Sequence, residues 1–335
     1  MILRAFLIFF GLSNGLYSYK CFEKDLWRHL LENLLAMLPE RLAALVHRLA
    51  AEQLNIVEEI RIRTNRPLEI AFREEVRFSN EVVTAEEAEQ FLGKISQFSF
   101  YMLDEQLRRG YITVAGGHRI GLAGKVVLDA GQVKGLRGIS SFNIRIAREQ
   151  IGVAERLVPY LYKKNWLSTL IVGAPQTGKT TYLRDLARFI SQGNLNHRIA
   201  AKKVGIVDER SEIAGCVNGI PQMTFGHRVD VLDACPKAEG MMMMIRSMSP
   251  DVLVVDEIGR AEDVQAIMEA VNAGIALIIS VHGNDFNEIL RRPSIKSIIE
   301  NGNFKRIIEL QRQKKPGVIT NIYDEEGRRL RRPLS

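Results

Sequence analysis

Hydrophobic positions near the start of the chain repeat at helical spacing on both sides of Pro39. A repeat of three to four residues places apolar side chains on one face of a helix, and proline ends a helix because it lacks the backbone donor. The pattern therefore predicts a helical hairpin over Phe22–Asn55. Its apolar face carries Leu26, Leu30, Leu34, Leu38, Leu42, Leu45 and Leu49.

The residues that follow change to a period of two. Apolar and charged residues alternate over Val57–Phe78, with a break at Asn65-Arg66-Pro67. Alternation with an intervening turn is typical of a half-buried β-hairpin. Thr84 and Glu87 then carry the signature of a capping box, which predicts a helix from this point to about Arg109.

Short apolar segments separated by glycines come next and predict a set of strands. Together with the preceding helices they indicate a small α+β domain over residues 23–150, with a boundary near Glu149–Pro159. The predicted strands are Tyr111–Ala115, His118–Leu122, Lys125–Leu128 and Ser141–Ala147.

From Trp166 onward, continuously apolar segments alternate with stretches long enough for helices. Strands have this pattern when they lie parallel in a sheet that helices cover on both faces. The fold class predicted for residues 151–335 is therefore α/β, with a doubly wound sheet. Its strands are expected at Thr169–Val172, Lys203–Val207, Val252–Val255 and Ile275–Val281, and its helices near Lys179, Lys237 and Glu262.

The composition is that of an ordinary globular protein, but its charge is unevenly distributed. Of 335 residues, 46% are apolar and 25% are charged, which excludes collagen-like, disordered and disulfide-scaffold proteins. The formal charge is +7, and residues 291–335 hold 12 Lys or Arg against 5 Asp or Glu, so the first 290 residues are balanced. This basic C-terminal segment is compatible with a solvated tail or with a surface for acidic lipid or nucleic acid.

The N-terminal residues and the cysteines indicate where in the cell the protein is expected. Residues 1–22 contain no acidic residue and include the apolar run Ala5–Leu12, which is too short to span a bilayer. We interpret this hydrophobic leader as a weak membrane anchor or an over-extended start, with a signal peptide as the alternative. Cys21, Cys216 and Cys235 show no metal-ligand spacing and indicate reduced thiols in a cytosolic protein.

The motif with the clearest chemistry follows the strand at Thr169–Val172. Residues 173–180, GAPQTGKT, satisfy G-x-x-x-x-G-K-[ST] at every fixed position and open a predicted helix. The glycines let successive backbone N–H groups face one polyphosphate, Lys179 adds a charge at the β- and γ-phosphates, and the Thr180 hydroxyl binds Mg²⁺. The predicted nucleotide contacts are Gly173, Ala174, Pro175, Gln176, Thr177, Gly178, Lys179, Thr180 and Thr181.

Acidic residues end two other predicted strands. Asp256 and Glu257 follow Val252–Val255, and we interpret Asp256 as a Mg²⁺ ligand and Glu257 as the base that activates water. Glu209 stands at the end of the strand predicted at Lys203–Val207, at the same edge of the sheet. It is therefore the competing candidate for the base.

Taken together, these motifs resemble the type II and type IV secretion ATPase superfamily of RecA-like motors, over Trp166–Tyr323. Within it, the chain resembles the ATPase family of the stage III sporulation complex. It differs from most secretion ATPases at Asp256, where they have glycine, and it lacks the cysteine cluster with which some of them bind zinc. The resemblance is carried by the phosphate loop, Val207-Asp208-Glu209, Val255-Asp256-Glu257, His282, Cys235–Met243, Gly116–Gly124 and Ile139–Arg148.

The resemblance implies a homo-hexameric ATPase that uses ATP and Mg²⁺. It implies a position in the cytoplasm of the mother cell at the inner face of a membrane, with other membrane proteins of the stage III sporulation complex as partners. It gives His282 a role in sensing the γ-phosphate. It also implies that arginines of the N-terminal domain approach the nucleotide, and the candidates are Arg119, Arg137 and Arg145.

The sequence thus predicts a ring motor that energises assembly of, or transport through, a sporulation-associated membrane channel. One alternative is a nucleic-acid-binding P-loop ATPase that uses the basic C-terminal segment. The other is a scaffold that binds nucleotide without hydrolysing it.

Overall fold

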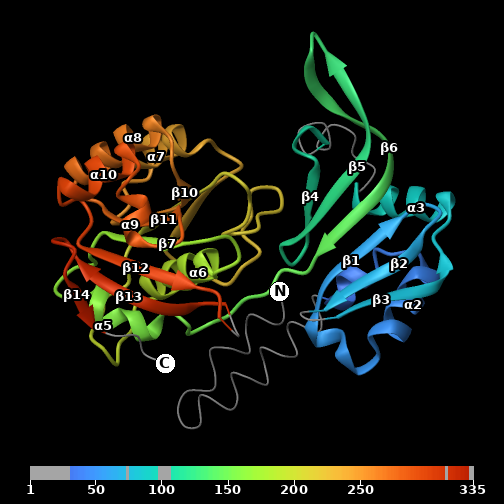
Figure 1. Cartoon of the computed structure of the whole chain (residues 1–335), viewed down its shortest axis with the longest axis horizontal. Coiled ribbons are helices and arrows are strands. Elements are labelled where there is room, and N and C mark those ends of the chain that lie inside the picture. Colours follow the sequence, from blue (N-terminus) through green and yellow to red (C-terminus); the bar gives the residue numbers. More distant parts are fainter. Residues whose placement is uncertain (1–30, 73–74, 97–106, 314–315, 332–335) are drawn as a thin grey trace. The chain divides into compact units, whose positions relative to one another are not determined.

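The computed structural model describes residues 31–72, 75–96, 107–313 and 316–331 (Figure 1). Backbone contacts divide the chain into two compact units between Arg148 and Glu149. The hydrophobic leader at residues 1–22, and Leu26 and Leu30 of the predicted hairpin, lie outside the described residues. No helix among the described residues is long and apolar enough to cross a membrane.

The N-terminal unit is built on an antiparallel sheet of six strands in the order β3-β2-β1-β6-β5-β4 (Figure 1). Helical segments pack against one face of it and share a single apolar core with the strands. The strands are β1 Val57–Arg63, β2 Pro67–Phe72, β3 Val76–Val82, β4 Tyr111–Val114, β5 His118–Asp129 and β6 Gln132–Arg145; the helical segments are α2 Glu40–Ala50, η2 Ala51–Ile56 and α3 Ala85–Ile95.

Alternation along the strands separates the buried face of this sheet from its polar face. In β1, Ile60 and Ile62 are fully buried, whereas Arg61 between them remains partly exposed. The antiparallel pairing of β1 with β2 confirms the predicted hairpin, and Asn65 in its turn has a φ of +57°. Asparagine tolerates this left-handed conformation better than most residues, which explains the break in the pattern there.

Two sequence predictions for this unit need correction. Helix α3 begins with the predicted capping box, but it ends at Ile95 rather than near Arg109. The strands predicted at His118–Leu122 and Lys125–Leu128 are one strand, because Gly124 does not interrupt β5. A side chain at Gly124 would lie 2.7 Å from the carbonyl oxygen of Gly138, so this glycine permits the close approach of β6 at a register shift.

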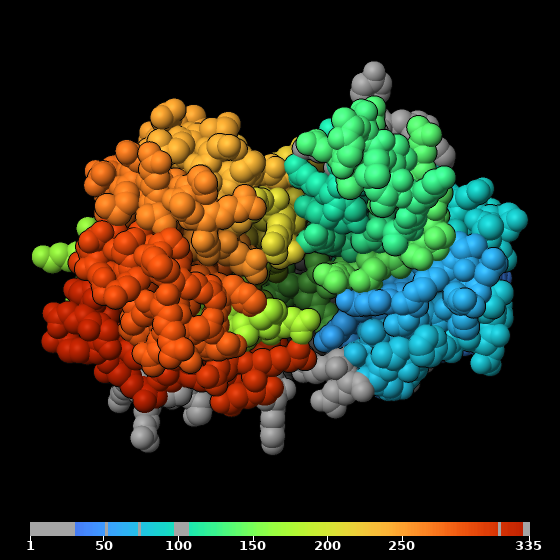
Figure 2. Space-filling model, turned by 45° about the horizontal axis from the view of Figure 1, so that its top comes forward, coloured from blue at the N-terminus to red at the C-terminus, as the bar shows by residue number. Residues whose placement is uncertain are grey.

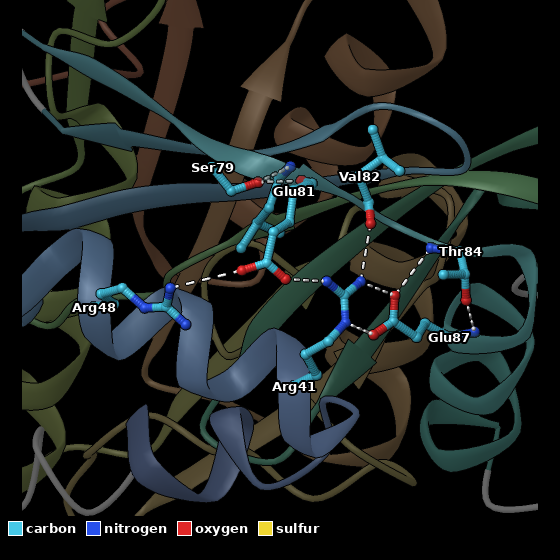
Figure 3. A network of polar contacts seen from close by, with 8 residues as sticks. Arg41, Arg48, Ser79, Glu81, Val82, Thr84 and Glu87 are labelled. Carbon is cyan, nitrogen blue, oxygen red and sulfur yellow. Dashed lines mark hydrogen bonds and ion pairs between the residues drawn. The ribbon is translucent and has the colours of Figure 1, made fainter.

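A polar network joins α2 to the connection between β3 and α3 (Figure 3). The Arg41 guanidinium contacts Glu87 through two nitrogens, at 2.7 and 2.6 Å, and Glu81 at 2.6 Å. It also donates to the carbonyl oxygen of Val82 at 2.9 Å. Glu87 in turn accepts from the backbone N–H of Thr84 at 2.9 Å and so completes the capping box. One arginine therefore ties three segments of the unit together.

The C-terminal unit is an eight-stranded sheet in the order β14-β13-β12-β7-β11-β10-β8-β9. The six strands from β12 to β9 are parallel, and β13 and β14 add antiparallel pairs at one edge. This confirms the predicted doubly wound sheet. The strands are β7 Thr169–Gly173, β8 Val204–Asp208, β9 Val229–Asp233, β10 Val252–Ile258, β11 Ala276–His282, β12 Arg306–Gln311, β13 Val318–Asp324 and β14 Arg329–Arg331.

Helices cover both faces of this sheet (Figure 1). One apolar core joins the sheet to α6, and a second joins the opposite face to α7, α8 and α10. The helical segments are η3 Glu155–Leu157, α5 Val158–Leu161, α6 Lys179–Gln192, α7 Lys237–Ser247, α8 Ala261–Asn272, α9 Phe286–Ile289 and α10 Pro293–Glu300.

The expectation of a basic C-terminal tail needs correction, because β12, β13 and β14 of the sheet lie in this segment. Within this unit their surface is continuous with that of the preceding helices (Figure 2). Arg306 is 7% exposed and donates to the carbonyl oxygen of Tyr160 at 2.9 Å, and Arg328 pairs with Asp324 at 3.0 Å. Arg306 thus ties β12 to α5, whereas the side chain of Arg328 is 69% exposed at the surface.

Candidate nucleotide-binding site

Four parallel strands end side by side at one edge of the C-terminal sheet. Gly173 at the end of β7 is in register with His282 at the end of β11. On the next strand, Val255 of β10 pairs with Ile279 of β11 and with Val207 of β8. The residues that follow these positions therefore meet at the carboxyl edge, where ligands bind in open α/β sheets.

The nine predicted nucleotide contacts run from the last residue of β7 through the following loop into the first turn of α6. Gly178 is the N-cap of α6 and has a φ of +92°, a conformation that favours glycine. Gln176 also lies in the left-handed region, with a φ of +61°. The loop delivers the N-terminus of a 14-residue helix to the sheet edge, where its partial positive charge attracts an anion.

Close packing explains the first glycine of the loop. A Cβ atom on Gly173 would clash with the Thr177 hydroxyl and lie 3.1 Å from the carbonyl oxygen of Leu310. The Thr177 hydroxyl itself donates to the carbonyl oxygen of Ala174 at 2.8 Å. The loop is therefore held in a closed turn by its own residues.

Lys179 is buried against this turn. Its Nζ donates to the carbonyl oxygens of Gly173 at 2.8 Å and Ala174 at 3.1 Å. Burial lowers the pKa of Lys179, and the nearby carboxylates of Asp256, Glu257 and Glu212 act to raise it. The ammonium group is thus surrounded by acids and by carbonyl oxygens of the loop.

Thr180 and Asp256 form the candidate metal site. The Thr180 hydroxyl donates to Asp256 Oδ2 at 3.0 Å, which joins α6 to β10. The other carboxylate oxygen of Asp256 accepts from the hydroxyl of Ser280 on β11. Mg²⁺ prefers oxygen ligands, and it is usually held by one or two protein oxygens together with substrate phosphates and water. The donor set present here fits that requirement.

Glu257 adopts an unusual conformation beside Asp256. Its φ is +49°, and the pairing of β10 with β11 shifts register between Val255 and Ile258. The side chain is 34% exposed, and Oε2 lies 3.0 Å from Nη1 of Arg210. Glu257 is therefore turned out of the regular strand, and its carboxylate remains accessible to water.

Glu209, the competing base, is differently placed. Its carboxylate forms an ion pair with Lys237 at the start of α7. The carboxylates that act on the pKa of Lys179 are those of Asp256, Glu257 and Glu212, and Glu209 is not among them. Glu209 is thus engaged by Lys237, whereas the Glu257 carboxylate acts on the pKa of the phosphate-loop lysine.

Asp208, which precedes Glu209, has a structural role. It is 1% exposed and accepts hydrogen bonds from the backbone N–H groups of Glu212, Ile213 and Ala214, at 2.8 to 2.9 Å. Burial raises the pKa of Asp208 to about 6. The loop after β8 is therefore folded around this carboxylate.

The remaining candidates are placed as follows. His282 is exposed, and its backbone carbonyl accepts from Arg292 at 2.5 Å. Arg119, Arg137 and Arg145 belong to the N-terminal unit. Arg119 and Arg145 are cross-strand neighbours on β5 and β6, whereas Arg137 pairs with Lys125 further along the same two strands.

Several contacts of the site were missed by sequence reasoning. Nη1 of Arg312 donates to Gln176 Oε1 at 2.5 Å, and Gly317 N–H donates to the carbonyl oxygen of Thr177 at 2.9 Å, so the β12–β13 hairpin braces the phosphate loop. No local pattern points to this contact. Ser280 carried a usable signal, because it precedes His282 by two residues on a strand and therefore shares its face.

Solved structures share this fold. The ATPase DotB of Legionella pneumophila aligns over 77% of this chain and 73% of its own, with a TM-score of 0.53 and 17% identity. The pilus retraction motor PilT, solved with bound ADP, aligns over 77% of this chain and 75% of its own, with a TM-score of 0.54 and 15% identity. These alignments confirm the RecA-like fold.

Sequence comparison identifies the family. The profile described as "Sporulation stage III, protein AA" matches residues 29–330. The stage III sporulation protein AA of Bacillus subtilis (strain 168) is 54% identical over 296 residues, which cover 88% of this chain and 96% of that protein. Because profile and relative both span most of the chain, it belongs to the stage III sporulation protein AA family.

Proposed function

We propose that this protein is a Mg²⁺-dependent ATPase that works as a homo-hexameric ring motor at a sporulation-associated membrane channel. The observation that carries the proposal is the meeting of Lys179, the Thr180–Asp256 pair and Glu257 at one sheet edge. A cation, a metal-compatible oxygen pair and an accessible carboxylate are the groups that phosphoryl transfer to water requires.

The phosphate loop binds the substrate in this mechanism. The N-terminus of α6 and the backbone N–H groups around Gly178 hold the β- and γ-phosphates of ATP. Lys179 exchanges its contacts with the carbonyl oxygens of Gly173 and Ala174 for phosphate oxygens, and its charge stabilises the transition state. Thr180 and Asp256 hold Mg²⁺, which when bound neutralises charge on the β- and γ-phosphates.

Glu257 acts on the attacking water. Its carboxylate orients the water and accepts a proton from it as the oxygen approaches the γ-phosphorus. For this step Glu257 must release Arg210, and because that ion pair is half exposed, its loss costs little. His282 at the end of β11 contacts the γ-phosphate, and Glu209 supports α7 through Lys237 instead of acting as the base.

We propose that an arginine from an N-terminal unit or from a neighbouring subunit completes the site in the ring. Arg119, Arg137 and Arg145 are the candidates for an arginine that neutralises transition-state charge, a contribution of roughly 10³–10⁵ in rate. We place the ring in the cytoplasm at the inner face of a membrane, with other stage III sporulation proteins as partners. The printed names of similar proteins support the sporulation and motor parts of this proposal: a stage III sporulation protein, an ATPase and a pilus retraction motor.

The nucleic-acid alternative is less favoured by the structure of the basic segment. It relied on a basic C-terminal tail, and β12, β13 and β14 of the sheet lie in that segment. Arg306 and Arg328 have partners within the fold. Salt-sensitive binding of a nonspecific oligonucleotide by the full chain is the result that would restore this alternative.

The experiment that tests the proposed function is Mg²⁺-dependent ATPase activity of the full chain over a range of protein concentrations, with Lys179→Ala as the blank. We expect specific activity to rise with concentration, because residues from a neighbouring subunit complete each site. Turnover equal to that of Lys179→Ala at every concentration overturns the ATPase assignment. Turnover that is independent of concentration in a chain shown to be monomeric overturns the ring.

A further inference from the structure

Ser280 lies at the centre of the C-terminal sheet and has no solvent-exposed surface. It is on β11, the strand between β7, which leads into the phosphate loop, and β10, which carries the acids. Most positions around it on these strands are apolar, so a hydroxyl at this depth is stabilised only if it is hydrogen-bonded.

The hydroxyl of Ser280 contacts both acidic residues of β10. It donates its proton to Asp256 Oδ1 and accepts a hydrogen bond of 2.9 Å from the backbone N–H of Glu257. The second contact lies at the register shift of β10, where the regular pairing with β11 is interrupted. The serine side chain thus replaces a backbone acceptor that the ladder does not offer at this point.

These two bonds fix different properties of the acids. The carboxylate of Asp256 is held between two hydroxyls, because Oδ2 accepts from Thr180 and Oδ1 from Ser280. The two hydrogen bonds, one to each oxygen, therefore fix the orientation of the Asp256 carboxylate plane. The bond to Glu257 N–H holds the strained conformation with a φ of +49°, which turns the Glu257 side chain out of the strand.

We infer that Ser280 is a positioning residue that sets the orientation of both Asp256 and Glu257 for hydrolysis of Mg-ATP. The inference rests on the proposed function and deepens it. Ser280 acts through its two neighbours and does not itself touch the reacting atoms. A purely structural serine would stabilise the sheet but would leave the Mg²⁺ response and the turnover of the folded enzyme unchanged.

Thr169 offers a matched control. It is also a hydroxyl residue of the same sheet with no exposed surface, but its Oγ1 donates to the carbonyl oxygen of Leu167 at 2.8 Å. Thr169 begins β7, whereas the phosphate loop follows its end. Thr169→Val therefore removes a buried hydrogen bond without removing a contact to Asp256 or Glu257.

The test compares Ser280→Ala, Ser280→Thr and Thr169→Val with the wild-type full chain. Steady-state ATPase assays give kcat and KM, thermal unfolding gives the folded fraction, and titration with adenylyl imidodiphosphate gives Kd with and without Mg²⁺. For Ser280→Ala we expect kcat to fall about 10- to 100-fold and KM to change less than about threefold. We expect the gain in affinity on adding Mg²⁺ to fall about fivefold, with Kd in its absence unchanged.

Each outcome decides the inference. Restoration of kcat by Ser280→Thr, with wild-type kcat in Thr169→Val, supports it. The inference is overturned if Ser280→Ala and Thr169→Val have the same kcat and the same increase in nucleotide affinity on adding Mg²⁺. If the wild-type chain shows no turnover above Lys179→Ala, the proposed function fails and the nucleotide titrations with and without Mg²⁺ alone decide the role of Ser280. In that case the inference about Ser280 is overturned if Ser280→Ala gains as much affinity on adding Mg²⁺ as the wild type does. It is also overturned if the wild type binds no nucleotide.

Discussion

The hydroxyl of Thr180 donates a 3.0 Å hydrogen bond to the carboxylate of Asp256, and 76 residues separate the two in sequence. This bond links the first turn of α6 to the end of β10. It places a neutral and a charged oxygen next to each other, beside the N-terminus of a helix. The N-terminus of α6 attracts an anion, and the oxygens of Thr180 and Asp256 suit a hard cation bound with that anion.

Replacement of Lys179 tests whether the site formed by the phosphate loop, Thr180 and Asp256 binds nucleotide. Lys179→Ala removes the cation of the phosphate loop, on which Asp256, Glu257 and Glu212 act, so we expect ATP affinity to fall at least about tenfold and turnover about 100-fold. Because burial already disfavours the charged lysine, its removal should leave the melting temperature almost unchanged. Titration calorimetry and thermal unfolding check both expectations. Lys164→Ala, at an exposed position, is the control.

Glu257 and Glu209 can be separated by conservative substitutions. Glu257→Gln keeps the side-chain shape but cannot accept the proton from water, so we expect kcat to fall about 10²- to 10⁴-fold with ATP binding retained. Glu209→Gln weakens the ion pair with Lys237 and is expected to cost about 1 kcal/mol of stability, with turnover within about threefold of the wild type. Normal turnover in Glu257→Gln and a large loss in Glu209→Gln would reverse the assignment.

The buried carboxyl of Asp208 predicts a pH dependence of stability. Its pKa is raised to about 6 in the folded protein, so between pH 4 and 6 the folded state binds a proton more tightly than the unfolded state. The stabilisation from this proton is complete below about pH 4 and is lost as the pH rises through about 6. Relative to Asp208→Asn, the wild-type C-terminal unit should therefore be more stable at pH 5 than at pH 7.5, by up to ~3 kcal/mol between the two extremes of the titration.

Urea unfolding followed by Trp166 fluorescence measures this difference, because Trp166 is buried in the core of the C-terminal unit. Trp27→Phe in both proteins leaves Trp166 as the reporter, since the chain has two tryptophans. The loss of backbone contacts in Asp208→Asn adds an offset that does not depend on pH. A free-energy difference that stays constant from pH 5 to 7.5 would show that Asp208 does not titrate in this range.

The Arg41–Glu87 pair predicts the opposite pH dependence in the N-terminal unit. Arg41 lowers the pKa of Glu87, so the stabilisation is present above the ordinary pKa of a glutamate and is lost as the pH falls through the lowered value. Arg41→Ala should destabilise this unit by about 1–2 kcal/mol at pH 7, a value discounted because the Arg41 side chain is 39% exposed.

Amide hydrogen exchange in peptides that cover β3 and α3 checks this prediction. We expect faster exchange in Arg41→Ala at pH 7 and a smaller difference at pH 4. Arg48→Ala is the matched control, because Arg48 is 68% exposed and lies 3.6 Å from Glu81. Equal effects of the two substitutions would mean that the contacts of Arg41 with Glu87 and Val82 contribute nothing measurable.

Much of the C-terminal unit, and the start of α3 in the N-terminal unit, could be predicted from local sequence pattern. The apolar runs that became β7, β8, β10 and β11, the phosphate loop that opens α6, and the capping box of Thr84 and Glu87 all depend on neighbours within a few residues. Helical and strand periodicity, helix caps and glycine-rich loops act over this short range. For the same reason Lys179 at the start of α6, and Asp256 and Glu257 near the end of β10, could be recognised from the sequence alone.

What only the tertiary structure decided depends on contacts between distant segments. Strand β12 pairs with β7, and Arg312 contacts Gln176 across 136 residues, so a segment that looks like a basic tail completes the sheet. The different surroundings of the two candidate bases are also nonlocal, since Lys237 pairs with Glu209 and the carboxylate of Glu257 acts on the pKa of Lys179. Periodicity determines which residues form a strand or helix, but strand order and the partners of each charge follow from packing the whole chain, where burial selects among many possible pairings.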